Sequence, residues 1–337
     1  MERQTRNVNQ FFRSPWGYAV LAALLAGAVV CALRFGSVGM SHAAFFAALF
    51  GDADERTNTL ILYAVRMPRV LSGVLAGMAL AASGVLLQSV TDNALASPNV
   101  IGVNAGAGVG VVLALAFFPV AVGLLPLFAI VGALITTLAV LLIARRAGGG
   151  RTAVVLSGVA VTALLNAFIS AATLVDSDLL STYNSFSVGG FAGARYSELI
   201  LPAIIVAIAL AAAFVLGGRI DLLSLGGGMA QSMGVRVRPL RFLCILCAAA
   251  LAAAAVSFAG LLGFVGLIVP HAARALVGNR VRHLLAASVL LGGTVTVSAD
   301  LLGRVLLAPA EIPVGIMMAL VGAPFFLGLL FWKRGSL

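Results

Sequence analysis

Charged side chains make up only 9% of this 337-residue chain, so the few that recur at helical spacing are the first candidates for chemistry. Arg66 and Arg69 stand three residues apart, and a guanidinium group binds carboxylates or phosphates through a fork of donors. Asp300 and Arg304 stand four apart with the acid first, an order that favours an ion pair along one helix. The first pair predicts an anion-binding face, which could anchor to lipid phosphate or dock acidic residues of an external protein.

The chain offers little for catalysis, nucleotide binding or metal binding. Its one lysine, Lys333, lies four residues from the end, so no glycine-rich turn precedes the lysine that a nucleotide-binding P-loop needs. His42, His271 and His283 are far apart, and none has a carboxylate three or four residues downstream. We therefore expect no catalytic residue, no metal site and no cofactor on this chain. If ATP drives the protein, the ATPase is a separate polypeptide.

The elements that must position the charged groups are membrane helices. Apolar residues make up 62% of the sequence, and hydrophobic runs of about 18 to 25 residues recur, each long enough to cross roughly 30 Å of hydrocarbon. The runs are continuous rather than alternating, which argues against membrane strands. The sequence predicts an all-α polytopic membrane protein that forms one domain over residues 1–337. About ten transmembrane helices are expected, at 16–35, 67–90, 99–117, 121–143, 152–175, 198–217, 241–258, 261–277, 284–307 and 313–332.

The distribution of basic residues predicts how these helices are oriented. If the N-terminus lies in the cytoplasm, ten spans place 15 arginines and lysines inside and 6 outside. Cytoplasmic loops are the ones enriched in such residues. Both termini are therefore expected in the cytoplasm, with residues 1–15 as a tail rather than a cleaved signal peptide. Because orientation in the lipid bilayer explains the basic excess, that excess does not indicate nucleic-acid binding.

One short polar segment stands between two long hydrophobic runs. Residues 223–235 read LSLGGGMAQSMGV, which is too polar to cross a bilayer and too short to form a domain. Arg219 and Arg236 flank this segment. We expect residues 219–240 to lie at the cytoplasmic surface, where they could transmit force from another protein.

A polar stripe runs along the predicted fifth span. Its members follow one another at intervals of four, four and three residues: Thr162, Asn166, Ser170 and Thr173. Polar stripes inside a membrane face other protein segments or a water-filled cavity. Hydrogen bonding between helices and lining of a translocation pathway are both compatible with this pattern.

Two features predict close or unusual backbone contacts inside the membrane. Gly102, Gly106 and Gly110 recur every four residues, which allows another helix to approach that face. Pro270 lies inside the predicted eighth span and has no N–H group, so one carbonyl of that helix needs a donor from a neighbouring segment.

Several ordered motifs resemble those of the FecCD-type permeases of bacterial ABC importers, over residues 60 to 333. Residues 66–69 (RMPR) are similar to the family's RLPR, and residues 223–235 to its LLSLGEEVARSLGV. Residues 263–274 (GFVGLIVPHAAR) match GFVGLIVPHIAR almost letter for letter. Further similarities lie at 83–88, 93–102, 299–304, 311–315 and 322–324. The chain departs from the family pattern at Ala94 (usually proline), at Gly227 and Gly228 (usually acidic) and at Phe186 (usually tryptophan).

The resemblance implies a fold like that of the vitamin B12 importer permease, in the bacterial cytoplasmic (inner) membrane. It also implies a second permease subunit, a cytoplasmic ABC ATPase dimer that holds ATP and Mg, and an extracytoplasmic substrate-binding protein. Docking of the binding protein then falls on Arg66, Arg69 and Arg304. Coupling to the ATPase falls on members of the polar segment: Leu223, Ser224, Leu225, Gly226, Met229, Ala230, Ser232, Met233 and Gly234.

In function, the resemblance implies a transport subunit that is not itself an enzyme. It would move an iron-siderophore or related metal chelate into the cytoplasm by ATP-driven alternating access, with vitamin B12 or haem as alternative cargo. Two other classes stay open from the residues alone. An ion-coupled secondary transporter needs buried acids that bind protons or sodium, and the acid expected within a span, Asp300, is expected to pair with Arg304. An intramembrane enzyme needs a paired-acid or metal signature.

Overall fold

A computed structural model of the chain describes residues 10–50, 56–118 and 122–334. Most of the predicted N-terminal tail, residues 1–9 of 1–15, lies outside these residues. The described residues form helices joined by loops, and no strand occurs among them. Seven helical stretches are long and apolar enough to cross a membrane: α2 (Pro15–Arg34), Arg56–Thr91, α7 (Leu125–Arg146), α8 (Arg151–Val175), α10 (Tyr196–Leu223), α12 (Val237–Ala259) and α14 (Val281–Val305).

Three further apolar helices lie where the sequence predicts spans, but they are not among these seven. They are α6 (Val103–Phe117), α13 (Val265–Val277) and α15 (Val314–Arg334). α6 and α13 are shorter than the runs predicted at 99–117 and 261–277. α6 is shorter because Pro98–Ile101 forms a separate 3-10 turn, η3. α13 is shorter because the chain at Phe264 takes a left-handed conformation (φ 64°), which no α-helix can contain.

The smaller helices were not predicted as elements of their own. They are α3 (His42–Phe50), α4 (Arg56–Leu60), the π-helix η2 (Ile61–Arg66), the 3-10 helix η4 (Val122–Leu124), α9 (Ser177–Val188) and α11 (Gly227–Ser232). The span predicted at 67–90 corresponds to α5 (Met67–Thr91), and α4 and η2 lead into it without a break. Met67 N donates to Leu62 O, five residues back, which is the hydrogen bond of a π-helix. Pro68, which has no N–H group, follows directly where these bonds give way to those of the α-helix.

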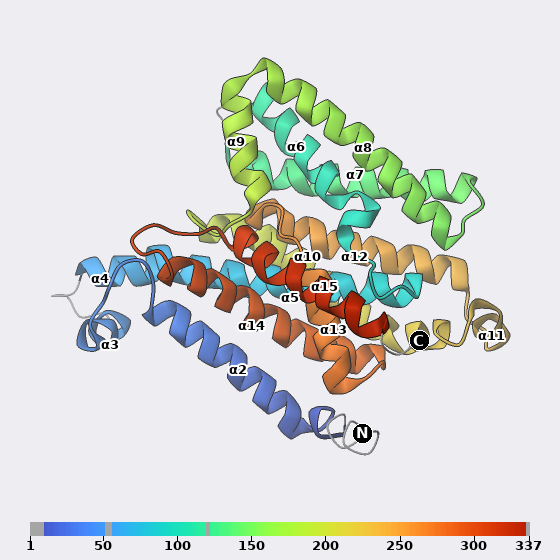
Figure 1. Cartoon of the computed structure of the whole chain (residues 1–337), viewed down its shortest axis with the longest axis horizontal. Coiled ribbons are helices and arrows are strands. Elements are labelled where there is room, and N and C mark those ends of the chain that lie inside the picture. The colour runs from blue at the N-terminus through green and yellow to red at the C-terminus, as the bar shows by residue number, and fades with distance from the viewer. Residues whose placement is uncertain (1–9, 51–55, 119–121, 335–337) are drawn as a thin grey trace.

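α5 lies at the centre of the molecule (Figure 1) and packs against α10, α12, α13 and α14. Helices α6 to α9 form a group on one side of this centre, and α2 lies on the other side against α14. α2 begins and α15 ends at the end of the molecule that carries α11, while α3 and α4 lie at the opposite end. We call these the inner end and the outer end.

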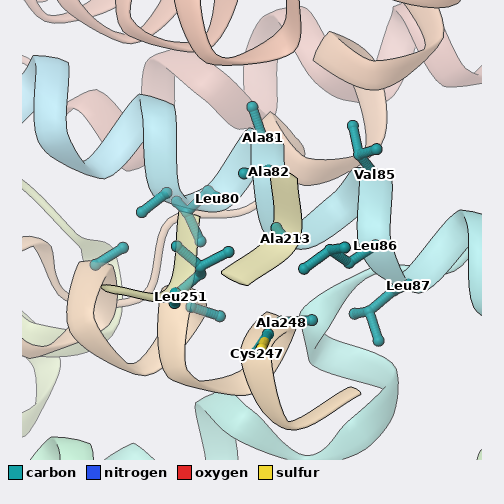
Figure 2. Close-up of a cluster of buried hydrophobic side chains, with 14 of the residues drawn as sticks. Leu80, Ala81, Ala82, Val85, Leu86, Leu87, Ala213, Cys247, Ala248 and Leu251 are labelled. Carbon is teal, nitrogen blue, oxygen red and sulfur yellow. The ribbon is translucent and has the colours of Figure 1, made fainter. Parts of the chain in front are cut away.

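Small side chains let the central helices approach closely. Figure 2 shows Leu80 and Leu86 of α5 on the side of that helix that faces Ala248 and Leu251 of α12, whereas Ala81 and Val85 point away. Ser83 Oγ on α5 donates to the Ala248 carbonyl at 2.6 Å, so a backbone group of one membrane helix is within reach of its neighbour. Such contacts, rather than bulky interdigitation, hold helices together in lipid.

The predicted glycine contacts are confirmed. A Cβ atom added at Gly106 would lie 2.6 Å from Gly132 O, and one at Gly110 would lie 2.1 Å from Phe128 O. Both partners belong to α7, so α6 and α7 touch through their backbones. The face of α6 that carries these glycines is therefore a packing face.

Candidate functional site

The inner end carries the short helix of the predicted coupling segment. The chain leaves α10 and turns at Gly226, whose φ of 99° suits glycine, before α11 begins. Leu223, the last residue of α10, and Ala230 of α11 are buried in the main core, where α11 packs against α10 and α12. The opposite side of the segment is open to the surroundings.

Most members of that segment are exposed. The large apolar side chains Leu225, Met229 and Met233 are 53%, 57% and 55% exposed. Ser224, Ser232 and Gly234 are also exposed. An exposed methionine-rich face adapts readily to a partner surface. The segment thus combines a buried attachment to the membrane helices with a free apolar face.

At the outer end, Asp300 of α14 lies between two arginines. Arg69 Nε donates to both carboxylate oxygens at 3.1 Å, and Arg69 Nη2 donates to Oδ1 at 2.9 Å. The Asp300 side chain is 4% exposed and that of Arg69 is 9% exposed. The predicted pairing of Asp300 with Arg304 is confirmed, since Arg304 Nε lies 3.0 Å from Oδ2, although its N–H is not aligned for a hydrogen bond.

The other donors of Arg304, and those of Arg66, bind the end of α2 and the chain just after it. Arg304 Nη1 and Nη2 each donate to Ala32 O at 3.2 Å. Arg66 Nη1 donates to Leu33 O and Arg34 O at 2.8 and 2.7 Å, and Nη2 donates to Val38 O at 2.6 Å. The last carbonyls of a helix have no partner within the helix. Arg66 and Arg304 therefore cap the outer end of α2.

Glu311 completes the group and is its most exposed acid. It lies on the loop between α14 and α15, where its Oε2 accepts from Arg69 Nη1 at 2.6 Å and its Oε1 accepts from Ser37 Oγ at 2.6 Å. Burial alone would raise the pKa of Glu311. The hydrogen bonds from Ser37 and Arg69, with the positive charge of Arg69, outweigh burial and hold that pKa below its usual value. Glu311 is thus ionised at neutral pH. We call Arg66, Arg69, Asp300, Arg304 and Glu311 the outer charge cluster.

The three arginines proposed for docking are therefore brought together, but as buried groups. Arg66, Arg69 and Arg304 are 4%, 8% and 2% exposed. Their donors are directed at groups of the same chain, and the role in docking stays a prediction. The geometry gives them a further task, which is to join α2, α5, α14 and the loop before α15 at the outer end.

The predicted polar stripe of α8 is divided between two environments. Asn166 and Ser170 are exposed, whereas Thr173 is buried and donates to Ile169 O within its own helix at 2.9 Å. Thr162 is partly buried, and its Oγ1 has no hydrogen-bond partner in the described part of the chain. The exposed part of the stripe faces away from the rest of the chain, and whether it lines a pathway stays a prediction.

The carbonyl of Gly266, which Pro270 leaves without its helical partner, accepts a hydrogen bond from Gln88. The helical partner of Gly266 O would be the N–H of residue 270, which proline lacks. Gln88 Nε2, at the end of α5, donates to this carbonyl at 3.3 Å, and Arg274 Nη2 donates to Gln88 Oε1 at 3.2 Å. A Cβ atom at Gly84 would lie only 1.9 Å from the same carbonyl, so this contact requires glycine.

Sequence reasoning missed the parts of the outer charge cluster that join distant segments. Arg69 and Asp300 are 231 positions apart, and Ser37 and Glu311 are 274 apart, so no local spacing points to either pair. Glu311 could have been singled out, because an ionised acid next to an apolar span needs a partner.

Comparison with known proteins places this geometry in a family of transporters. Residues 24–332 match the FecCD transport family. The chain is 36% identical over 312 residues to the Fe(3+)-citrate import system permease protein YfmE of Bacillus subtilis, covering 92% of this chain and 93% of that protein. It is 33% identical over 326 residues to the hemin transport system permease protein HmuU of Yersinia pestis, covering 94% and 96%.

A solved structure resembles the fold over nearly the whole chain. An inward-facing conformation of a metal-chelate type ABC transporter superposes with a TM-score of 0.83 at 30% sequence identity, covering 95% of this chain and 100% of that one. With its long apolar helices, the chain is a multi-pass membrane protein.

The buried position of Asp300 generates a stability prediction. Asp300→Asn removes the negative charge between Arg69 and Arg304, and breaking a buried pair in this way costs about 3–5 kcal/mol. We expect the variant to unfold at lower denaturant concentration in detergent micelles than the unmodified protein. Asp178→Asn, at an exposed acid of α9, is the matched control and should change little. Equal stability of the two variants would contradict the structural role of Asp300.

Proposed function

This chain belongs to the FecCD transport family and is a permease subunit of an ABC importer, and we propose that the importer carries a ferric chelate. Support comes from relatives named for ferric citrate and hemin, which align over more than nine-tenths of this chain. Ferric siderophores are the cargo class we favour, and haem or vitamin B12 is the alternative. The proposed location is the bacterial cytoplasmic membrane, with ten spans and both termini inside.

We assign ATP hydrolysis to a separate cytoplasmic ATPase dimer, which would hold the ATP and Mg. The single observation that carries this assignment is the form of the inner end. α11 is attached to the membrane helices by Leu223 and Ala230, while Leu225, Met229 and Met233 are free to enter a partner. Closure of the ATPase dimer would move α11, and α11 would move α10 and α12.

We place the docking of a substrate-binding protein at the outer end. Arg66, Arg69 and Arg304 bring three positive charges to the outer charge cluster, against two from Asp300 and Glu311. The cluster is therefore one positive charge in excess. Such an excess favours acidic residues on the partner and raises the rate of encounter.

We place the pathway beside α8, between this chain and a second permease subunit. Asn166 and Ser170 of α8 have no cover from the rest of this chain. Polar groups in such a position would be costly against lipid, so a partner helix or a hydrated pathway suits them better. The second subunit could be an identical copy or a related chain.

An ion-coupled secondary transporter fits the structure less well. That class uses buried acids that bind and release protons or sodium. Asp300 is the acid that the sequence singles out within a span, and it is held by Arg69 and Arg304 in the described structure.

The cargo proposal predicts an uptake specificity. The test uses proteoliposomes that contain this permease, its partner permease and the ATPase, with ATP enclosed in the lumen and the binding protein added outside. We expect these vesicles to accumulate ⁵⁵Fe-labelled ferric citrate or ferric hydroxamate. The same vesicles without ATP provide the control. Accumulation of labelled cobalamin or haem without accumulation of labelled iron chelate would contradict the proposed cargo. It would leave the assignment as an ABC importer unchanged.

The coupling assignment predicts that a bulky residue on α11 separates hydrolysis from transport. Ser232→Trp enlarges an exposed position of α11 without disturbing buried Ala230, so it should misplace the contact with the ATPase. We expect ATP hydrolysis to continue while uptake falls at least about tenfold, because coupling needs a defined geometry that a 1 Å displacement can destroy. Ala147→Trp, at an exposed position of the loop between α7 and α8, is the control. Normal uptake by the Ser232 variant would contradict the assignment.

The docking assignment predicts a loss of binding-protein affinity. Arg69→Gln removes the charge that faces Glu311, whereas Arg69→Lys keeps the charge and loses the fork. We expect the dissociation constant for the binding protein to rise most in the glutamine variant and less in the lysine variant. Elution of each variant as an intact complex with the ATPase in size-exclusion chromatography reports that both variants remain folded. Unchanged affinity in a folded glutamine variant would rule out docking at Arg69.

A further inference from the structure

A cavity of about 490 Å³ opens beside the outer charge cluster. Arg69 and Glu311 form part of one wall, and Asn184 and Ser185 of α9 belong to its lining. The remaining lining comes from the turn after α9, at residues 188–192, and from Pro313. The ion pair between Arg69 and Glu311 is thus the point at which the buried cluster meets an open space.

Arg69 holds its two carboxylate partners in different ways. Nε and Nη2 bind Asp300, whose side chain is 4% exposed and fixed on helix α14. Nη1 binds Glu311, whose side chain is 29% exposed and lies on a loop. Removing Glu311 would leave the guanidinium group in place, because Asp300 still orients it. Nη1 would then face the cavity without a partner.

From this arrangement we propose that Glu311 is a built-in competitor for docking. In the undocked permease it occupies the place on Arg69 that an acidic side chain of the binding protein takes when the two proteins meet. The proposal rests on the docking function assigned above and specifies how the site is kept closed beforehand. Docking is then an exchange of one carboxylate for another rather than a simple addition.

Exchange is favoured over addition by the position of the donors. Arg66 and Arg304 direct their Nη groups at backbone carbonyls in the last turn of α2 and just after it, so neither offers a free pair of donors to an incoming carboxylate. An acid that entered the cavity beside Glu311 would share one Nη1 with it. Two carboxylates at one donor repel each other, and like charges in such a site disfavour joint ionisation.

The loop that carries Glu311 is also bonded to the helices around the cavity. Glu311 is followed by Ile312, whose N–H donates to Gly303 O of α14, and by Gly315, whose N–H donates to Gly189 O at the end of α9. A Cβ atom at Gly315 would lie 1.8 Å from Val188 O, so α15 and α9 meet backbone to backbone. The loop that carries Glu311 is therefore in direct contact with α14 and with the end of α9, so the exchange takes place at the junction of these helices.

The test measures binding-protein affinity in the full complex of permease and ATPase. Glu311→Gln removes the competing charge and keeps the shape of the side chain. If Glu311 competes, the dissociation constant should fall at least about fivefold, which is a modest effect for a close charge pair at an interface. Ser37→Ala, which removes the hydrogen bond that holds Glu311, should lower the constant in the same direction by a smaller factor.

Glu198→Gln is the matched control, because Glu198 is a part-buried acid in the first turn of α10, at the same outer end but outside the cluster. The general loss of one negative charge should change the affinity of this variant less than about twofold. An equal fall of the dissociation constant in the Glu198 and Glu311 variants would show that only the overall charge matters. That result would overturn the exchange. Unchanged or weaker binding by a folded Glu311→Gln complex would overturn it as well.

The outcomes separate this proposal from the docking assignment. If Arg69→Gln weakens binding but Glu311→Gln does not strengthen it, docking stands and the exchange fails. If Arg69→Gln leaves binding unchanged in a folded complex, both fail together.

Discussion

Asp300 is a buried carboxylate, and the outer end of the protein is organised around the need to neutralise it. An unpaired charge in this position would cost several kcal/mol. Arg69 and Arg304 supply two positive charges, and each has donors left over. The remaining donors bind a carbonyl in the last turn of α2 and the carboxylate of Glu311 before α15. One acid therefore determines how four segments, far apart in the sequence, meet at one end of the molecule.

The inner end is built differently, and its form is the one that the proposed coupling to an ATPase requires. Its short helix α11 is attached through buried Leu223 and Ala230 and leaves an apolar face free. The two ends are connected by α5, whose 25 residues span about 37 Å. Arg69 lies in the first turn of α5 and Gln88 in its last. The same helix therefore carries the ion pair with Asp300 at the outer end and, near the inner end, the donor to the Gly266 carbonyl of α13.

Hydropathy predicted the membrane helices well because bilayer thickness sets a length that local sequence can report. Local spacing also predicted the pair of Asp300 with Arg304 and the glycine face of α6. It could not predict which arginines are buried, because the partners of Arg69 come from α14 and from the loop before α15. Nor could it predict α9 or α11, whose few turns carry too little periodic signal. The family resemblance predicts where docking and coupling would fall, but not that the three arginines at the predicted docking site already bind groups of the same chain.

The exchange at Arg69 is tested most directly by cryo-electron microscopy of the complex with and without its binding protein. In the undocked complex, Glu311 should contact Arg69 Nη1, as it does here at 2.6 Å. In the docked complex, a carboxylate of the binding protein should occupy that place, and Glu311 should lie beyond hydrogen-bond distance. A docked structure in which Glu311 still binds Arg69 and the acidic residues of the partner lie elsewhere would contradict the account.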